Sequence, residues 1–91
     1  MPRDPNAVIA LTIYSRPDCH LCEDMKAVVR RIAAERSQGI QVSEVDISND
    51  AELEKLYGVE VPVLLANGRK VAKYGITEQD LRRILARLQA E

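Results

Sequence analysis

The spacing of hydrophobic residues along the chain alternates between the pattern typical of strands and the pattern typical of helices, and these changes predict its secondary structure. Residues 8–14 (VIALTIY) are rich in β-branched and aromatic side chains, which is typical of a buried strand. From Cys19 or His20 to about Ser37, hydrophobic residues recur every three or four positions, and charged residues fill the positions between them. This spacing predicts an amphipathic helix, and Gly39 lies just beyond its end, where a glycine commonly stops a helix.

Further elements are predicted along the rest of the chain. They are expected in the order strand, helix, strand, strand, helix, over residues 40–47, 51–57, 61–66, 69–74 and from Thr77 onward. The segment Ser48–Asp50 offers capping side chains to the short helix, and Gly58 closes it. Asn67-Gly68 is a strong hairpin signal, so the two strands that flank it should pair antiparallel.

The order of these elements is β-α-β-α-β-β-α. It predicts an α/β fold in which a four-stranded mixed sheet is packed by three helices. At 91 residues the chain has room for a single domain, which we place at residues 7–91. Residues 1–6 are expected to form a flexible N-terminal lead-in. The architecture alone does not define a function.

Composition and charge narrow the range of partners. Hydrophobic residues make up 46% and charged residues 30% of the chain, as in folded globular proteins. The net charge of -1 gives no electrostatic reason to expect nucleic acid as a partner. No stretch approaches the roughly 18 apolar residues that a membrane span needs, and the first residues do not resemble a secretory signal. We therefore expect a cytoplasmic monomer without a membrane or nucleic-acid partner.

The two cysteines of the chain, Cys19 and Cys22, form a C-x-x-C motif. In the first turn of a helix, positions three apart lie on the same side with Cβ atoms about 5–6 Å apart, so these thiols can form a disulfide with little backbone movement. The ring that such a disulfide closes is so small that it hardly restrains the unfolded chain. A redox role for the disulfide is therefore favoured over a purely structural one. Structural zinc usually takes four ligands, whereas the chain has two cysteines and one histidine. Metal or cluster binding stays open as the alternative interpretation.

The expected position of Cys19 at a helix N-terminus favours its thiolate form. Unpaired backbone N–H groups and the positive end of the helix dipole lower the pKa of a thiol there. Arg16 would add positive charge from the preceding loop, and a protonated His20 would add it beside the thiol. Cys22 lies deeper in the turn and should be more shielded. We therefore assign Cys19 as the nucleophile that attacks a substrate disulfide and Cys22 as the resolving thiol.

The sequence resembles the glutaredoxin-like branch of the thioredoxin fold. The resemblance is carried by the strand–loop–C-x-x-C–helix order, the segment Leu56–Pro62 (LYGVEVP), the Asn67-Gly68 hairpin and the closing helix. It implies a thioredoxin-like fold of glutaredoxin type, with a cis Val61–Pro62 bond that faces the cysteines. In relatives, the residue before this proline offers its backbone to an extended substrate, which gives that role to Val61.

The resemblance also implies a substrate site. Arg16 lies three residues before Cys19, where glutaredoxins often carry a lysine that helps to hold the carboxylate of glutathione. Thr77 would cap the last helix, whose first N–H groups could meet another carboxylate. His20 would modulate the stability of the neighbouring thiolate.

The expected function is that of a thiol–disulfide oxidoreductase, which reduces protein or glutathione mixed disulfides through Cys19 and Cys22. It would require no cofactor, with glutathione as a candidate co-substrate and a separate reductase system to regenerate the dithiol. The alternative is that the same cysteines bind an iron–sulfur cluster or a soft metal ion. No separate metal site is expected.

Overall fold

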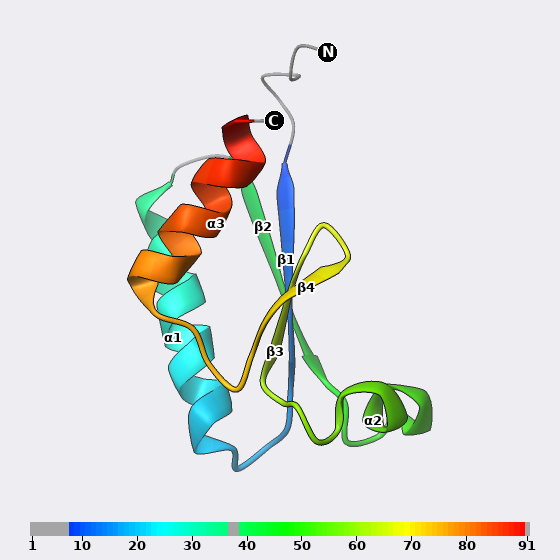
Figure 1. The fold of residues 1–91 in the computed structure, drawn as a ribbon. Coiled ribbons are helices and arrows are strands. Elements are labelled where there is room, and N and C mark those ends of the chain that lie inside the picture. Colours follow the sequence, from blue (N-terminus) through cyan, green and yellow to red (C-terminus); the bar gives the residue numbers. More distant parts are fainter. Residues whose placement is uncertain (1–7, 37–38, 91) are drawn as a thin grey trace.

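The computed structural model describes residues 8–36 and 39–90 and contains the expected elements in the expected order (Figure 1). They are β1 Ile9–Ser15, α1 His20–Glu35, β2 Ile40–Asp46, α2 Ala51–Tyr57, β3 Val63–Ala66, β4 Arg69–Lys73 and α3 Glu78–Ala90. The predicted β-α-β-α-β-β-α fold is therefore confirmed. The expected lead-in at residues 1–6 lies outside the described residues. No helix within 8–36 and 39–90 is both long enough and apolar enough to cross a membrane.

The strands form one mixed sheet in the order β2-β1-β3-β4. β1 and β2 are parallel because α1 connects them across one face of the sheet, and their register pairs Leu11 with Val42. β3 runs antiparallel to both β1 and β4. Figure 1 shows α1 and α3 side by side on one face of the sheet. α2 lies on the opposite side, near the end of the sheet where β1 leads into α1.

The core lies between the sheet and the helices α1 and α3. In β1 every second side chain points into it, and Ile9, Leu11 and Ile13 are at most 3% exposed. The buried helical members of the same cluster are Met25, Val29, Ile32, Leu81 and Leu85. A strand places alternate residues on one face and a helix places every third or fourth residue there, which is why the hydrophobic pattern predicts this core.

Local side-chain signals set the turns. Asn67 and Gly68 have φ values of 52° and 83°, the left-handed geometry of a type I′ hairpin, which asparagine and glycine adopt most readily. The Asn67 carboxamide also accepts the N–H of Ala10 at 2.9 Å. At the start of α2, Asp50 Oδ1 accepts the N–H of Leu53 at 3.0 Å. The sequence predicts both the hairpin at Asn67-Gly68 and the cap of α2.

Two element boundaries differ from the prediction. α1 ends at Glu35 instead of about Ser37, because the backbone of Arg36 is extended (φ -106°, ψ 111°) and its N–H donates to the carbonyl of Ala33. β3 begins at Val63 instead of residue 61, since Pro62 has no N–H to give to a sheet. The other boundaries agree to within one residue.

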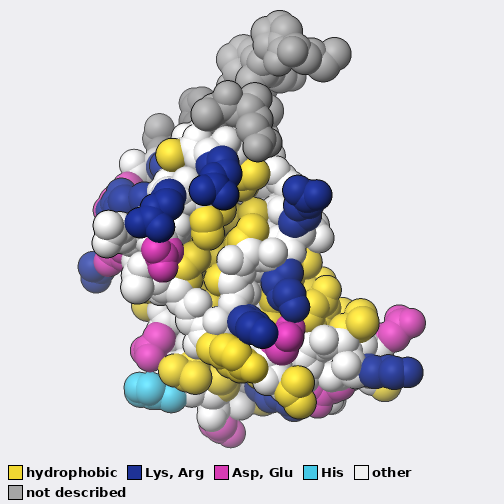
Figure 2. All heavy atoms as spheres, in the orientation of Figure 1, with side chains coloured by type: hydrophobic (Ala, Val, Ile, Leu, Met, Phe, Trp, Pro, Cys, Tyr) yellow, Lys and Arg dark blue, Asp and Glu magenta, His cyan; other side chains and the backbone are white. Residues whose placement is uncertain are grey.

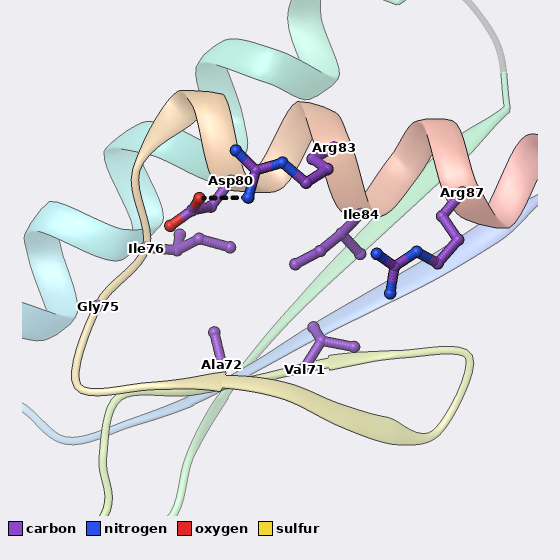
Figure 3. A pocket seen from close by; sticks show the side chains of 8 residues that line it. All are labelled: Val71, Ala72, Gly75, Ile76, Asp80, Arg83, Ile84 and Arg87. Carbon is purple, nitrogen blue, oxygen red and sulfur yellow. Dashed lines mark ion pairs between the residues drawn. The ribbon is translucent and has the colours of Figure 1, made fainter.

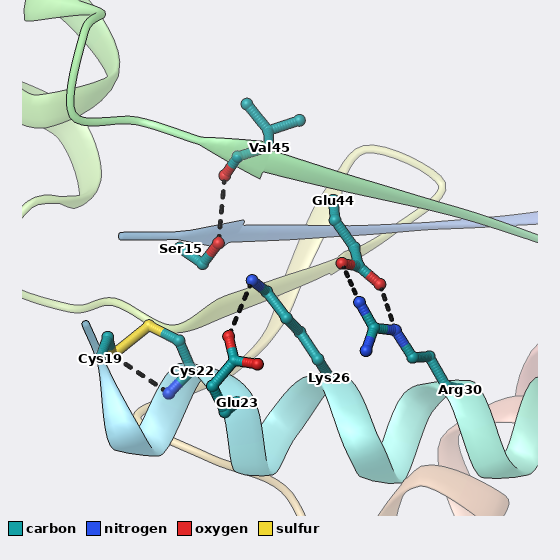
Figure 4. A network of polar contacts seen from close by, with 8 residues as sticks. All are labelled: Ser15, Cys19, Cys22, Glu23, Lys26, Arg30, Glu44 and Val45. Atoms are coloured by element: carbon teal, nitrogen blue, oxygen red, sulfur yellow. Dashed lines mark hydrogen bonds and ion pairs between the residues drawn. A yellow bond between two sulfur atoms is a disulfide. The ribbon is translucent and has the colours of Figure 1, made fainter. Parts of the chain in front are cut away.

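An ion pair fastens α1 to the outer strand β2 (Figure 4). The Arg30 guanidinium donates two hydrogen bonds to the Glu44 carboxylate, from Nε at 2.7 Å and from Nη2 at 2.6 Å. These bonds lower the pKa of Glu44 below its ordinary value and raise the pKa of Arg30. The pair links α1 to β2, and its exposure to solvent keeps its contribution to stability small.

Candidate active site

Cys19 and Cys22 form a disulfide at the start of α1 (Figure 4). Their Cα atoms are 5.1 Å apart, within the usual range for a disulfide, because positions three apart share one side of the first turn. The pair lies at the end of the sheet where the chain leaves β1 and enters α1 (Figure 1). The pairing expected from the spacing is therefore confirmed.

Cys19 is the residue that caps α1. The loop reaches it through Asp18, whose backbone is left-handed (φ 57°), and Cys19 itself is extended (φ -109°, ψ 109°). Its sulfur accepts the backbone N–H of Cys22 at 3.1 Å, which is the geometry of a side-chain N-cap. In the reduced protein the same N–H and the helix dipole would stabilise a thiolate on Cys19.

The two cysteines differ in exposure. Cys22 is 0% exposed and lies on the buried side of α1, together with Met25 one turn later. Cys19 is partly exposed. A substrate disulfide can approach only a sulfur that lies at the surface, so this difference supports Cys19 as the attacking thiol and Cys22 as the resolving thiol.

Lys26 is a charged residue near the disulfide that the C-x-x-C motif alone does not identify. It follows Cys22 by one helical turn, its side chain is only 16% exposed, and its Nζ lies 3.1 Å from a carboxylate oxygen of Glu23. Figure 4 shows this side chain directed toward the end of α1 that carries the disulfide. Its position four residues after Cys22 places Lys26 one helical turn from the disulfide. The same position also suits a solvent-exposed helix face, so the sequence alone does not identify this residue. His20, by contrast, is exposed at the first position of α1.

The Val61–Pro62 peptide bond is cis, as the resemblance implied. The register pairs Tyr14 of β1 with Val63 of β3, so Pro62 lies at the end of the sheet from which the disulfide loop departs. The Pro62 carbonyl accepts the N–H of Tyr74 at 2.7 Å, which ties the start of β3 to the end of β4. Val61 is partly exposed, and its backbone contact with an extended substrate stays a prediction.

Arg16 forms hydrogen bonds and an ion pair with residues of α2 and its C-terminal end. Its Nη1 donates to Glu54 Oε2 at 2.7 Å, and its Nη2 lies 2.5 Å from Glu54 Oε1 and donates to the carbonyl of Gly58 at 2.7 Å. These bonds join the loop before the disulfide to α2. The expected contact between Arg16 and the carboxylate of glutathione stays a prediction, and such a carboxylate would have to compete with Glu54.

Thr77 caps α3, as expected. Its Oγ1 accepts the N–H of Asp80 at 3.0 Å, and its carbonyl accepts the N–H of Leu81 at 3.0 Å. Because the preceding loop starts at Tyr74, which is bonded to Pro62, this cap belongs to the same end of the sheet as the cis bond. Its part in binding a carboxylate stays a prediction.

Replacing Gly58 by alanine should loosen the contact between Arg16 and α2. A Cβ at this position would overlap the carbonyl oxygen of Glu54 and lie 2.8 Å from Nη2 of Arg16. We expect the free energy of unfolding, measured in urea, to fall by about 1–3 kcal/mol, the usual cost of overpacking. Gly75→Ala is the matched control, since a Cβ there meets nothing within 4 Å. Equal unfolding midpoints for the two variants would show that Gly58 has no such packing role.

A metal site would need ligands from outside the described part of this chain. Within residues 8–36 and 39–90, no three or more His, Cys, Asp or Glu side chains are grouped so that they could hold a metal ion. Cys19 and Cys22 supply two soft sulfur ligands, and an iron–sulfur cluster usually takes four. A cluster would therefore have to be shared with a second molecule, and this alternative stays a prediction.

Fold and site together define a class: a thioredoxin-type protein with a redox-active C-x-x-C disulfide at the start of its first helix. Within this class, the chain belongs to the family described as the glutaredoxin-like domain (DUF836), whose model matches residues 10–86. No match was found among the curated proteins. The family assignment confirms the resemblance seen in the sequence.

Solved structures have the same fold. Protein XcR50 from X. campestris is 37% identical with a TM-score of 0.66, and the match covers 85% of this chain and 96% of that one. Protein Ne2328 from Nitrosomonas europaea is 26% identical with a TM-score of 0.70, over 91% and 98% of the two chains. The germline-specific thioredoxin Deadhead from Drosophila melanogaster is 24% identical with a TM-score of 0.63, over 91% and 83%. This last likeness shows the fold alone.

Proposed function

We propose that the protein is a thiol–disulfide oxidoreductase that reduces disulfides by dithiol exchange. One observation carries the proposal: the sulfur of the partly exposed residue Cys19 caps α1 and is bonded to the sulfur of the buried residue Cys22. A disulfide in this position can be opened and closed by exchange with other thiols, without a further cofactor. The proposed nucleophile is Cys19, and the proposed resolving thiol is Cys22.

The exchange would proceed in two balanced steps. The Cys19 thiolate attacks one sulfur of a substrate disulfide, a mixed disulfide forms, and the other substrate sulfur leaves as a thiolate. Cys22 then loses its proton and attacks the sulfur of Cys19, which closes the Cys19–Cys22 disulfide and releases the second substrate thiol. The substrate gains one electron pair and the protein loses one. An external thiol or reductase returns that pair to the protein.

Exposed hydrophobic side chains favour a protein disulfide as the substrate. Leu21 inside the motif is 51% exposed, Val59 before the cis bond is 89% exposed, and Tyr74, which is bonded to Pro62, is 49% exposed. Figure 2 shows hydrophobic side chains gathered at the lower end of this view, near the chain's single histidine. Exposed apolar side chains that gather at one place are typical of interaction surfaces. A protein chain can cover them during exchange.

Glutathione is proposed as a co-substrate that reduces the protein less efficiently than a dithiol reductase does. The first turn of α3 behind Thr77 offers N–H groups to a carboxylate, but Arg16 already bonds to Glu54. A carboxylate of glutathione would therefore lack its strongest positive partner. We propose that a dithiol reductase regenerates the protein more efficiently than glutathione does, and that the protein works as a monomer in the cytoplasm.

An assay with two electron donors tests this preference. With insulin as the disulfide substrate, NADPH consumption should be faster with thioredoxin reductase than with glutathione and glutathione reductase. Glu54→Gln removes the charge that holds Arg16, so it should raise the glutathione-dependent rate selectively. The preference is wrong if the wild-type protein works faster with glutathione. The oxidoreductase proposal itself is wrong if neither donor supports turnover above that of a Cys19→Ser/Cys22→Ser control.

A further inference from the structure

A groove lies between β4 and α3 (Figure 3). Val71 and Ala72 rise into it from β4, and Ile76 and Ile84 border it from the side of α3. These four hydrophobic side chains are partly exposed, and neither cysteine lines the groove. The groove is therefore an apolar surface separate from the redox disulfide.

A bulge in β4 makes the floor of this groove. The register pairs Leu64 with Ala72 and Leu65 with Lys70, so Val71 is an additional residue in β4. At such a bulge the usual alternation of side chains is interrupted. Figure 3 shows the result, because the neighbouring side chains of Val71 and Ala72 both point toward α3. Two hydrophobic side chains in succession thus widen the apolar floor.

Basic side chains outnumber acidic ones at the mouth of the groove. Arg83 and Arg87 stand one turn apart on α3, and Figure 3 shows both among the lining side chains. Asp80 lies 3.6 Å from Arg83, whereas Arg87 forms no ion pair with another described residue. Arg69 is paired with Ala66 in the β3–β4 register. Since Ala66 belongs to the core between the sheet and the helices, Arg69 lies on the α3 face of the sheet. Figure 2 shows a hydrophobic strip that is bordered mainly by Lys and Arg side chains, with an acidic side chain also at its edge.

β4 is also an edge strand. Among the described strands it pairs only with β3, so its outer row of backbone N–H and C=O groups is available to another chain. A strand added there would place every second side chain on the α3 face, next to the groove. The remaining side chains would lie on the opposite face of the sheet.

The groove is small compared with most sites for cofactors or drug-sized ligands. Its volume of about 270 Å³ is below the range of about 300–1,000 Å³ that is usual for small-molecule sites. Such a space suits one or two apolar side chains of a peptide. The arginines at its mouth suit carboxylates, because a guanidinium binds a carboxylate with two parallel hydrogen bonds.

We infer that the β4–α3 groove binds an extended acidic segment of a protein partner. The segment adds a strand to β4, places apolar side chains between Val71 and Ile84, and presents carboxylates to Arg83 and Arg87. The groove begins beside Tyr74, which is bonded to Pro62, so one partner can occupy both the groove and the redox end of the molecule. This binding goes beyond the proposed redox function and takes place without turnover.

Titration of the oxidised protein with peptides tests the inference. The probe is a blocked seven-residue peptide, Val-Thr-Glu-Thr-Val-Thr-Glu, in which valine and glutamate take every second position and so share one face of an added strand. Its charge-reversed counterpart has lysine in place of glutamate. Methyl NMR signals of Val71 and Ile84 should shift and saturate with the glutamate peptide, and the lysine peptide should bind at least tenfold more weakly. Arg87→Glu should weaken the glutamate peptide at least tenfold. Lys55→Glu, the same charge change on the exposed surface of α2, should alter binding less than twofold.

Each other result overturns the inference. Equal binding of the two peptides would show that charge does not select the partner. Shifts centred on Leu21 would assign the peptide to the redox end, and the absence of saturable shifts would show that the groove binds no such segment. Shifts of Val71 and Ile84 that depend on protein concentration without peptide would assign this edge to a second copy of the chain. Because the disulfide stays closed throughout, none of these outcomes depends on the redox proposal.

Discussion

Cys19→Ser should reduce the rate of disulfide reduction to the uncatalysed background, while Cys22→Ser should stop the reaction after its first step. A serine hydroxyl at position 19 is not ionised at neutral pH and cannot form a mixed disulfide. In Cys22→Ser the nucleophile and its position at the helix cap are kept, but the thiol that resolves the mixed disulfide is missing. With disulfide-bonded insulin as the substrate, this variant should accumulate as a mixed disulfide with an insulin chain, seen as a band on a non-reducing gel that dithiothreitol removes.

The two variants control for each other, because both lose the Cys19–Cys22 disulfide. Any effect of that loss on stability is common to them, so a difference in trapping reports the roles of the two sulfurs. A covalent complex with Cys19→Ser would reverse the assignment of nucleophile and resolving thiol. Equal trapping by both variants would show that the burial of Cys22 does not separate their roles.

Met25→Ala should be the most destabilising of the substitutions considered for this chain. Met25 is 0% exposed, belongs to the core cluster between the sheet and α1, and follows Cys22 by three positions. Truncation leaves a cavity, and we expect a loss of about 2–5 kcal/mol in the free energy of unfolding. Since a small domain is stable by only about 5–15 kcal/mol in total, this loss should lower the urea midpoint strongly.

Val59→Ala is the matched control for Met25→Ala. It also removes apolar atoms, but Val59 is 89% exposed. Its effect on the free energy of unfolding should stay within about 0.5 kcal/mol. Urea unfolding of both variants, in the oxidised protein, makes the comparison. Similar midpoints for the two would contradict the position of Met25 in the core.

Features that depend on neighbouring residues could be predicted from the sequence. The cap at Asp50 and the closing Gly58 predict the short helix at 51–57 with the bounds that are observed, and both signals are local. The hairpin followed from Asn67-Gly68 for the same reason. The position of Cys19 at the start of α1 followed from the change of hydrophobic period. In each case the determining contacts lie within a few residues of one another.

Features that depend on distant residues could not be predicted in this way. Arg16 bonds to Glu54, 38 residues away, and nothing in its own neighbourhood identifies that partner. The bulge at Val71 is a property of the register between β3 and β4, not of the β4 sequence alone. The groove and the low exposure of Lys26 likewise arise only when helices pack on the sheet. The residue types of the site were therefore predictable, whereas their partners were not.

The pH dependence of alkylation in the reduced protein tests the central claim most directly. The claim is that the cap of α1 makes Cys19 the reactive thiolate, because its sulfur accepts the N–H of Cys22 and lies at the positive end of the helix. Iodoacetamide labelling, mapped by mass spectrometry, should modify Cys19 before Cys22 and give Cys19 a pKa below the ordinary thiol value of about 8.5. A Cys19 that titrates at or above that value, or a Cys22 that reacts first, would contradict the account.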